Sequence, residues 1–477
     1  MNSLKIAVVG GGVTGLTAAY ILAKARRSGA PADEFLIEGS QRLGGLVLTE
    51  RVGDFVVEGG PDSFLSEKPE ARALCEELGL GGELIGSNDA SRQTYVLHRG
   101  RLEPLPDGFL FFVPSRPWSA LKSPLLSPSG KLAVLRNFFW QSPAKGEVDE
   151  TVASFVRRRF GQDFLDDLVQ PLLAGVYGGN PEELSAQAVL GRLLALEREH
   201  GSIVRAAIRL RHKRRASGPL FTTLRSGLGT LIEALGGKLR SEETRFELGR
   251  RVVRLEAGLG AARRYRLSCD GGDSYEADAV ILALPAFECA RLLQPHSAEL
   301  AVLLGGVPYT DAATVNLGFL AAPALPPGFG FLVPKREGRK LLACTFVHAK
   351  FPGRVPAGSA LLRCFFGGAQ GAAALETSDE ELLQTATREL RAALGLEPKA
   401  DFHRIFRWPR ALPQYAVGHK DRVRATREKL NSLPGLFLGG NAYAGVGISD
   451  CVRSGKEAAE AAIKYAEGWK RENSVAR

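Results

Sequence analysis

The sequence predicts an α/β protein that begins with a parallel sheet covered by helices. Three neighbouring segments predict this class. Residues 5–9 are an apolar run rich in β-branched side chains, which is typical of a strand buried on both faces. A glycine-rich turn follows, residues 16–25 have a helical composition, and residues 35–37 form a second apolar strand. A strand, a helix and a second strand in this order indicate a βαβ unit.

The turn after the first strand has the glycine spacing of a dinucleotide-binding site. Gly10 lets the chain turn tightly, Gly12 has no Cβ and leaves room for a pyrophosphate, and Gly15 lets the helix pack close to the strand. The helix N-terminus offers unpaired N–H groups and a partial positive charge to the phosphates. A glycine-rich turn without a ligand is the alternative. The contacts expected from this Rossmann-type unit are Gly10, Gly11, Gly12, Val13, Thr14, Gly15, Glu38 and Gly39.

An acidic residue and a second glycine pair indicate which dinucleotide binds. Glu38 ends the second strand, where it can accept hydrogen bonds from ribose hydroxyls and would repel the 2′-phosphate of NADP. With Arg42, Gly44 and Gly45 it fills an E-x-x-x-R-x-G-G pattern. This stretch resembles the FAD-binding proteins of the amine oxidase, phytoene desaturase and protoporphyrinogen oxidase superfamily, in which it lies along the flavin. Because NAD enzymes do not usually carry the pattern, the resemblance implies FAD.

Four further segments resemble cofactor-contacting parts of the same superfamily. Residues 58–63 resemble its E-x-G-P segment, where small residues let the backbone pass the isoalloxazine ring. Residues 250–255 match a strand that contacts the adenine, and residues 407–415 match a W-x-x-[AG]-[IL]-P-Q-Y motif. Residues 445–451 begin a helix whose N–H groups can stabilise negative charge on the reduced ring. The resemblance implies contacts from Arg42, Gly44, Gly45, Leu46, Gly60, Pro61, Asp62, Ser63, Val252, Trp408, Gly440, Val446, Gly447 and Ile448.

Two motifs narrow the resemblance to the protoporphyrinogen oxidase family. Residues 172–181 are similar to its P-L-x-x-G-V-[YF]-[AG]-G-[ND] stretch, and residues 439–450 match its C-terminal segment. The resemblance covers nearly the whole chain and implies oxidation of protoporphyrinogen IX to protoporphyrin IX in haem biosynthesis. Three two-electron steps would each send a hydride to the flavin N5, and O2 would reoxidise the flavin to give H2O2. We therefore expect no catalytic side chain, and the sequence has no metal-ligand spacing of His or Cys.

The substrate pocket implied by this family takes a large apolar macrocycle with two propionates, so we expect an apolar slot with a cation at its mouth. The resemblance implies that Arg92 binds a propionate and that the Gly175 carbonyl meets a pyrrole N–H. Leu332 and Phe365 are the apolar walls that we expect. The alternatives are coproporphyrinogen III, which has four propionates and would need more cations, and an amine or a polyene. An amine is disfavoured because Tyr443 has no second aromatic residue nearby. A non-catalytic flavoprotein or membrane-bound scaffold is the more distant alternative.

Composition and charge restrict the partners. A formal net charge of +10 suits anionic lipid, nucleic acid or a carboxylate substrate, and the sequence has no recognisable nucleic-acid-binding module. Aromatic and basic residues alternate over residues 109–140, and basic residues crowd residues 205–215. Both patterns are typical of a membrane surface, with a helical core and a solvated helix face as the alternatives. Residues 312–334 are uncharged, but prolines interrupt them, so we expect two buried strands there rather than a membrane span.

The 477 residues are too many for one ordinary core, and we expect several domains. The FAD-binding domain is predicted to combine residues 1–90, 211–290 and 416–477. Residues 91–210 are expected to form a substrate-binding and helical, membrane-facing region, and residues 291–415 an α+β substrate-binding sheet domain. The absence of a secretory signal and of a disulfide framework suggests a cytoplasmic protein attached peripherally to the inner face of the cell membrane. The family resemblance also implies a homodimer.

Overall fold

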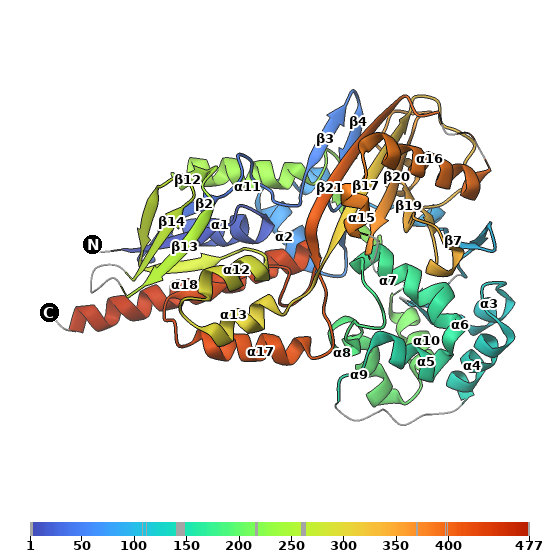
Figure 1. Cartoon of the computed structure of the whole chain (residues 1–477), viewed down its shortest axis with the longest axis horizontal. Helices are drawn as coiled ribbons and strands as arrows, with labels where there is room; N and C mark the ends of the chain where they lie inside the picture. The colour runs from blue at the N-terminus through green and yellow to red at the C-terminus, as the bar shows by residue number, and fades with distance from the viewer. Residues whose placement is uncertain are drawn as a thin grey trace.

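The computed structural model is elongated, with a parallel sheet at one end and a second sheet beside a helical cluster at the other (Figure 1). Both termini lie at the end that holds the parallel sheet, so the chain leaves this end and returns to it. The structure describes residues 3–106, 108–110, 112–139, 148–214, 218–258, 264–368, 371–395, 397 and 399–475.

The parallel sheet is assembled from distant parts of the chain. Its order is β12-β2-β1-β16-β22, and every neighbouring pair is parallel. The strands are β1 (Leu4–Val9), β2 (Ala32–Glu38), β12 (Arg245–Leu248), β16 (Ala279–Leu282) and β22 (Leu436–Leu438). Because all strands run the same way, their carboxyl ends share one edge, where ligands bind in folds of this type.

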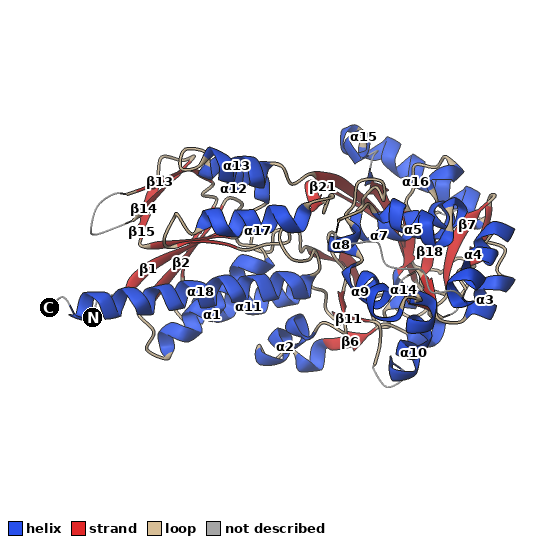
Figure 2. Cartoon of the chain, turned by 90° about the horizontal axis from the view of Figure 1, so that it is seen from below, coloured by secondary structure: helices blue, strands red, loops and turns tan. Residues whose placement is uncertain are grey.

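Helices and a small sheet cover the two faces of the parallel sheet, as Figure 2 shows. Ile6 and Val8 face a core shared with α1 (Val13–Arg27), α11 (Gly229–Ser241) and α18 (Ile448–Val475). Ala7 and Val9 face the opposite core. That second cover consists of α12 (Ala286–Leu293), α13 (Ala298–Gly305), α17 (His419–Leu430) and the antiparallel strands β13 (Val252–Ala257), β14 (Tyr265–Cys269) and β15 (Ser274–Ala277). Burial on both faces explains why the central strands β1 and β16 are almost entirely apolar.

The second sheet has seven strands in the order β21-β17-β20-β19-β18-β7-β8. Its pairs are antiparallel except β18–β7. The strands are β7 (Thr94–His98), β8 (Arg101–Pro104), β17 (Tyr309–Phe319), β18 (Gly330–Leu332), β19 (Ala343–Phe346), β20 (Ala360–Gly367) and β21 (Phe402–Pro413). One face packs on α16 (Asp379–Leu394), and the other face carries side chains of the candidate site. The two strands predicted within residues 312–334 are confirmed as parts of β17 and β18.

A cluster of helices with its own apolar core flanks the second sheet. It contains α3 (Pro117–Lys122), α4 (Pro128–Phe139), α5 (Val152–Phe160), α6 (Gln162–Phe164), the π-helical turn η3 (Leu165–Val169), α7 (Gln170–Tyr177), α8 (Ala186–Val189), α9 (Gly191–His200) and α10 (Ile203–Arg214). Phe112 and Leu125 are buried in this core, whereas Trp118, Leu132 and Phe139 are exposed. Core packing and an apolar surface therefore coexist between residues 109 and 139. Phe111 and Trp140, which belong to the same aromatic pattern, lie outside the described residues.

The basic segment predicted at residues 205–215 is partly structural. Arg205 donates to the carbonyl oxygens of Phe138 (2.6 Å) and Phe139 (3.0 Å), and so it binds the C-terminal end of α4. A cation is favourable at this end of a helix. Arg209 is exposed, and the side chains of residues 211–215 lie outside the described set.

Short elements connect these layers. They are β3 (Thr49–Val52), β4 (Phe55–Glu58), β5 (Phe64–Leu65), α2 (Pro69–Glu77), η1 (Gly81–Glu83), β6 (Leu84–Gly86), η2 (Asp89–Ser91), β9 (Phe109–Leu110), β10 (Val113–Pro114), β11 (Phe221–Leu224), η4 (Lys335–Glu337), α14 (Val347–Lys350) and α15 (Gly371–Glu376). Among the described helices, none is long and apolar enough to cross a membrane.

Candidate active site

The glycine turn places backbone, not side chains, at the edge of the parallel sheet. Gly10 has φ +110°, and a Cβ there would clash with the Ala283 carbonyl oxygen. A Cβ on Gly15 would clash with the Gly10 carbonyl oxygen, because α1 packs directly on the turn. A Cβ on Gly12 would meet nothing within 4 Å, and Gly12 lines a large cavity. Gly10 and Gly15 therefore permit close packing, whereas Gly12 leaves open space before the N-terminus of α1, where a phosphate would be stabilised.

The loop after β2 lies against this turn. Glu38 accepts hydrogen bonds from the backbone N–H groups of Gly11 (2.6 Å) and Ser40 (2.8 Å), and it lines the cavity. The Gly44 N–H donates to the Gly11 carbonyl (2.8 Å), which joins the two glycine segments. Arg42 lies behind the loop and donates to the carbonyl of Gly45 (2.6 Å). Arg42 therefore positions the loop from outside the cavity.

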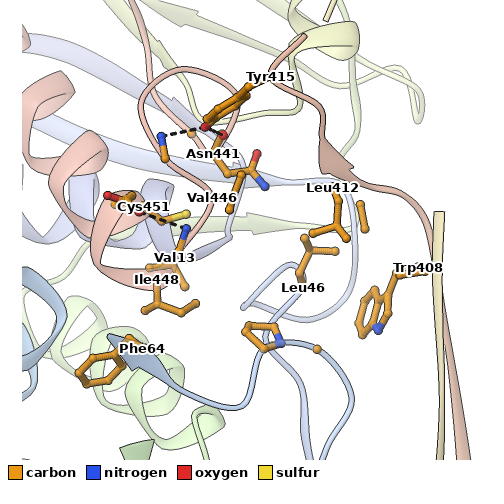
Figure 3. A pocket seen from close by; sticks show the side chains of 18 of the residues that line it. Val13, Leu46, Phe64, Trp408, Leu412, Tyr415, Asn441, Val446, Ile448 and Cys451 are labelled. Carbon is orange, nitrogen blue, oxygen red and sulfur yellow. Dashed lines mark hydrogen bonds between the residues drawn. The ribbon is translucent and has the colours of Figure 1, made fainter. Parts of the chain in front are cut away.

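The C-terminal loop closes the opposite side of the cavity. The Tyr415 hydroxyl donates to the Asn441 carbonyl (2.5 Å) and accepts the Gly445 N–H (2.7 Å), as Figure 3 shows. This hydroxyl holds both ends of the loop that leads to α18, and the loop lines the cavity from Gly440 to Ile448. Tyr415 occurs in a motif that the sequence suggested, but its positioning role is visible only when β21 lies beside this loop.

The first turn of α18 carries a buried acid. Asp450 is 4% exposed and lies 2.6 Å from the Lys68 ammonium nitrogen and 2.6 Å from Arg453 Nη2. The Gly447 N–H donates to the same carboxylate (3.3 Å). Helix α18 begins at Ile448, within the segment where the sequence predicted a helix start, and continues to Val475.

The second sheet and the helical cluster form the apolar end of the cavity. Phe365 lies on the sheet face, Leu332 lies at the end of β18, and Gly175 faces them from α7. A Cβ on Gly175 would be 3.3 Å from Leu332 Cδ2, so these two predicted residues adjoin. Trp408 lines the same cavity and donates its indole N–H to the Gly59 carbonyl (2.8 Å).

Charged groups lie below the loop at residues 59–63. Glu58 and Arg354 form a buried ion pair with 2.8 Å between Oε1 and Nη1. Asp62 lies 3.0 Å from the Lys350 ammonium, and Arg363 donates to the Gly59 carbonyl (3.2 Å). Burial alone would raise the pKa of Asp62, but Lys350 and Arg363 hold that pKa well below its usual range. Burial lowers the pKa of Arg363.

The cavity brings together most of the predicted residues in a volume of about 1780 Å³. A pocket for one small ligand usually has roughly 300–1,000 Å³, so this cavity has room for a dinucleotide and a large second ligand. The predicted residues outside its lining are Gly11, Gly15, Gly39, Arg42, Arg92 and Val252. Gly11, Gly15 and Val252 are buried, and the Arg92 side chain is exposed, 3.9 Å from the Asp89 carboxylate. The structure therefore does not place Arg92 in the cavity wall.

Sequence reasoning missed the cations of the cavity wall, among them Lys350 and Arg363. Arg363 had a usable signal, because alternation along a strand places it on the same face as Phe365. Lys350 had none, since it follows β19 on a single helical turn.

The residues present fit a flavin dinucleotide. At one end, the open space at Gly12, the N-terminus of α1 and the acid at Glu38 are the groups that would hold a pyrophosphate and a ribose. The loop before α18 and the residues from Gly60 to Ser63 form a long wall toward the second sheet.

Comparison with known families gives the class of the protein. Residues 13–463 match the family described as flavin containing amine oxidoreductase, and the chain belongs to this family. A flavin is therefore the cofactor that the family implies, in agreement with the donor set of the cavity.

Individual relatives align along nearly the whole chain. A coproporphyrinogen III oxidase of Bacillus subtilis is 31% identical over 96% of this chain and 98% of its own. Protoporphyrinogen oxidase 1 of Arabidopsis thaliana chloroplasts is 30% identical over 95% of this chain and 86% of its own.

Solved structures confirm the α/β fold. A putative protoporphyrinogen oxidase from Exiguobacterium is 32% identical with a TM-score of 0.87, covering 97% of this chain and 99% of that chain. A UDP-galactopyranose mutase has a TM-score of 0.72 at 18% identity and shares the fold alone.

Proposed function

We propose that this protein is an FAD-dependent oxidase that converts coproporphyrinogen III to coproporphyrin III, with O2 as the acceptor and H2O2 as the product. The relatives that align along nearly the whole chain support this proposal, because those from Bacillus subtilis and Arabidopsis thaliana are named as oxidases of porphyrinogens. Two that are 31% identical, from Bacillus subtilis and Propionibacterium freudenreichii, are named coproporphyrinogen III oxidase. Protoporphyrinogen IX, which the sequence motifs suggested, is the second candidate and is supported by the plant relatives.

Bound FAD would supply the hydride acceptor, and O2 would restore its oxidised state. The chain's own task is to bind and orient. Gly12 and the N-terminus of α1 would hold the pyrophosphate, and Glu38 the ribose. The first N–H groups of α18 would face the ring edge where negative charge develops.

The substrate would occupy the apolar end of the cavity. Phe365 on β20 and Leu332 on β18 offer apolar contacts to a macrocycle. A macrocycle packed against them would exclude water from the carbon that is oxidised. Gly175 on the facing helix has no side chain, so its backbone lies next to the macrocycle, and its carbonyl is our candidate acceptor for a pyrrole N–H.

The charges around the cavity support a substrate with several carboxylates. Lys350 and Arg363 line its inner wall, and Arg192, Lys420 and Arg427 line it where α9 and α17 meet. The sequence suggested one cation, Arg92, whereas four propionates require several. The cavity wall has more Lys and Arg side chains than Asp and Glu side chains, and this surplus of cations favours coproporphyrinogen III over protoporphyrinogen IX.

Steady-state assays with both substrates test this proposal. Each porphyrinogen is prepared by chemical reduction without oxygen, mixed with purified protein in aerated buffer, and followed by the growth of porphyrin fluorescence. We expect kcat/KM for coproporphyrinogen III to exceed that for protoporphyrinogen IX by about ten-fold or more, the size of one or two charged contacts. The opposite preference would replace the proposal by its second candidate, and a preparation without flavin absorbance would contradict both.

We also propose that the surface of α3 and α4 contacts an anionic membrane. Trp118, Leu132 and Phe139 are exposed there, beside the exposed cations Lys122 and Arg136. Flotation with anionic liposomes tests this, and a Trp118→Ser/Phe139→Ser variant should lose most of the bound fraction. Recovery of the wild-type protein in the liposome-free fraction would contradict it. The homodimer remains a prediction that light scattering can test.

A further inference from the structure

A cluster of five charged groups lies between the second sheet and the loop at residues 59–63. One part of it is closed. Arg354 and Glu58 are 1% and 4% exposed, with Nη1 and Oε1 2.8 Å apart. Glu58 also accepts the Leu228 N–H (2.8 Å) and the Thr49 hydroxyl (2.6 Å). This pair needs no further ion.

The other part of the cluster has one carboxylate and two cations, and all three groups line the cavity. Asp62 accepts from the Lys350 ammonium at 3.0 and 3.3 Å. Arg363 is 3% exposed, donates to the carbonyls of Gly59 and Gly60, and its Nε has no hydrogen-bond partner among the described residues. Two carboxylates and three cations leave the cluster with one positive charge. A buried charge without a partner is unfavourable, so an anion that enters the cavity is stabilised there.

Lys350 is the cation of this cluster that a ligand can reach with the least disturbance. It ends α14, and its ammonium lies 4.7 Å above the Phe221 ring and 4.9 Å above the Phe351 ring. The side chain is 12% exposed and can turn on its flexible stem, whereas Arg363 is fixed under the loop by two carbonyls.

The position of Lys350 also matches one edge of the apolar pocket. Its carbonyl accepts the Asn88 N–H (2.9 Å), which attaches α14 to η2, and Arg92 follows η2 directly. Thr94, two residues further, lines the cavity. Lys350 thus lies inside the cavity at the edge where Arg92 lies outside it.

We propose that Lys350 binds a carboxylate of the substrate and in doing so exchanges Asp62 for that carboxylate. Asp62 keeps Arg363 as its neighbouring cation during the exchange, so the loop that would pass the flavin stays in place. Lys350 is then a specificity-determining residue that distinguishes a macrocycle with a carboxylate at this edge from one without. This inference depends on the proposed function, because it takes the substrate to be a porphyrinogen.

Equilibrium binding of the product and of its neutral ester tests the inference. The probes are coproporphyrin III and coproporphyrin III tetramethyl ester, titrated into the FAD-loaded protein and followed by porphyrin fluorescence. Lys350→Met should weaken binding of the free acid by about ten-fold or more and leave binding of the ester unchanged, because only the acid can pair with the ammonium. Lys350→Arg should retain most of the affinity. In turnover, Lys350→Met should raise KM with little change in kcat.

Matched variants separate a local role from a general one. Lys429→Met removes another ion-paired lysine, which lies on α17 outside the cavity wall and pairs with Glu299, and it should leave binding of the acid unchanged. The double variant Lys350→Met/Asp62→Asn removes both charges and serves if Lys350→Met alone does not fold, and it should show the same loss for the acid.

Three outcomes would overturn the inference: equal affinity of the Lys350→Met variant and the wild type for the acid, an equal loss for acid and ester, or a changed flavin midpoint potential with unchanged discrimination between acid and ester. The last would mean that the surplus charge acts on the flavin. If the wild type itself neither binds coproporphyrin III nor oxidises coproporphyrinogen III, the proposed function fails instead.

Discussion

The two ends of the cavity are lined by different kinds of chemical groups. At the parallel sheet, contacts come from backbone: the turn at Gly10–Gly15 and the loop from Gly440 to Ile448 present N–H groups and bare Cα atoms. At the second sheet, the cavity wall consists of side chains, among them Phe365 and Arg363 on β20 and Lys350 on the adjoining α14. Substitution therefore acts at the first end mainly through space and backbone conformation, and at the second end through charge and shape.

This difference explains why one end suits a cofactor and the other a variable substrate. A pyrophosphate is the same in every dinucleotide, and backbone N–H groups at a helix N-terminus suffice to bind it. Substrates of one family differ in side groups, which side chains on a rigid sheet distinguish without altering the cofactor end. Substitutions that separate backbone effects from side-chain effects therefore test this difference between the two ends.

The largest effect is expected at the boundary between the two ends, where Arg354 pairs with Glu58. Arg354→Met leaves a buried carboxylate without its partner, which typically destabilises a protein by about 3–5 kcal/mol. Denaturant unfolding measures the change. The variant Arg354→Met/Glu58→Leu should recover much of the loss, and equal instability of the single and double variants would show that the pair is not the cause.

The second-largest effect is expected on the pH dependence of stability, and it comes from His419. This residue is 4% exposed and stacks on Tyr415 with ring centroids 4.1 Å apart. Burial, followed by the neighbouring Arg422, lowers the pKa of His419 to about 4. The unfolded chain binds a proton at this residue below pH 6.5 and the folded chain only below about 4, so stability falls as the pH decreases between these values, by about 3 kcal/mol in total.

His419→Phe keeps the stacking and removes the titration. Unfolding free energies measured from pH 7 to pH 4 should therefore decrease less steeply in this variant than in the wild type. Parallel pH profiles of the two proteins would contradict the assignment.

Two glycine substitutions in the same turn should have intermediate effects. They distinguish a glycine that is needed for packing from a glycine that leaves room for a ligand. Gly15→Ala places a Cβ against the Gly10 carbonyl and should destabilise even the flavin-free protein, by about 1–3 kcal/mol. Gly12→Ala points into open space and should leave the flavin-free protein within about 0.5 kcal/mol of the wild type while it weakens FAD binding.

Thermal unfolding of the flavin-free proteins and flavin titration together measure the two effects. If Gly12→Ala binds FAD like the wild type, backbone access at Gly12 is not what the cofactor needs.

The smallest effect is expected at Arg92, whose side chain is 46% exposed and lies outside the cavity wall. Arg92→Ala should raise KM for the porphyrinogen by less than about five-fold, the range of a solvent-exposed charge contact, and by less than Lys350→Met. Steady-state kinetics of both variants show which substitution raises KM more. If KM rises more in the Arg92 variant than in the Lys350 variant, Arg92, which the sequence suggested, is the main contact of the substrate carboxylate.

The α/β class and the glycine turn at the edge of the parallel sheet could be predicted from the sequence, because both depend on local spacing. The order of strand, Gly10–Gly15 turn, helix and Glu38 is contiguous, and each glycine acts through its own backbone. The two strands in the uncharged stretch at residues 312–334 were also predictable, because repeated prolines exclude a long helix.

Which charges line the cavity depends on the tertiary structure. Asp62 is far in the sequence from Lys350 and Arg363, and a loop, a helical turn and a strand bring the three charges together beneath Gly59 and Gly60. The tertiary structure also left Arg92 outside the wall and placed the Tyr415 hydroxyl between Asn441 and Gly445. Local spacing specifies backbone geometry, whereas the position of a side-chain charge depends on contacts between segments that the sequence keeps apart.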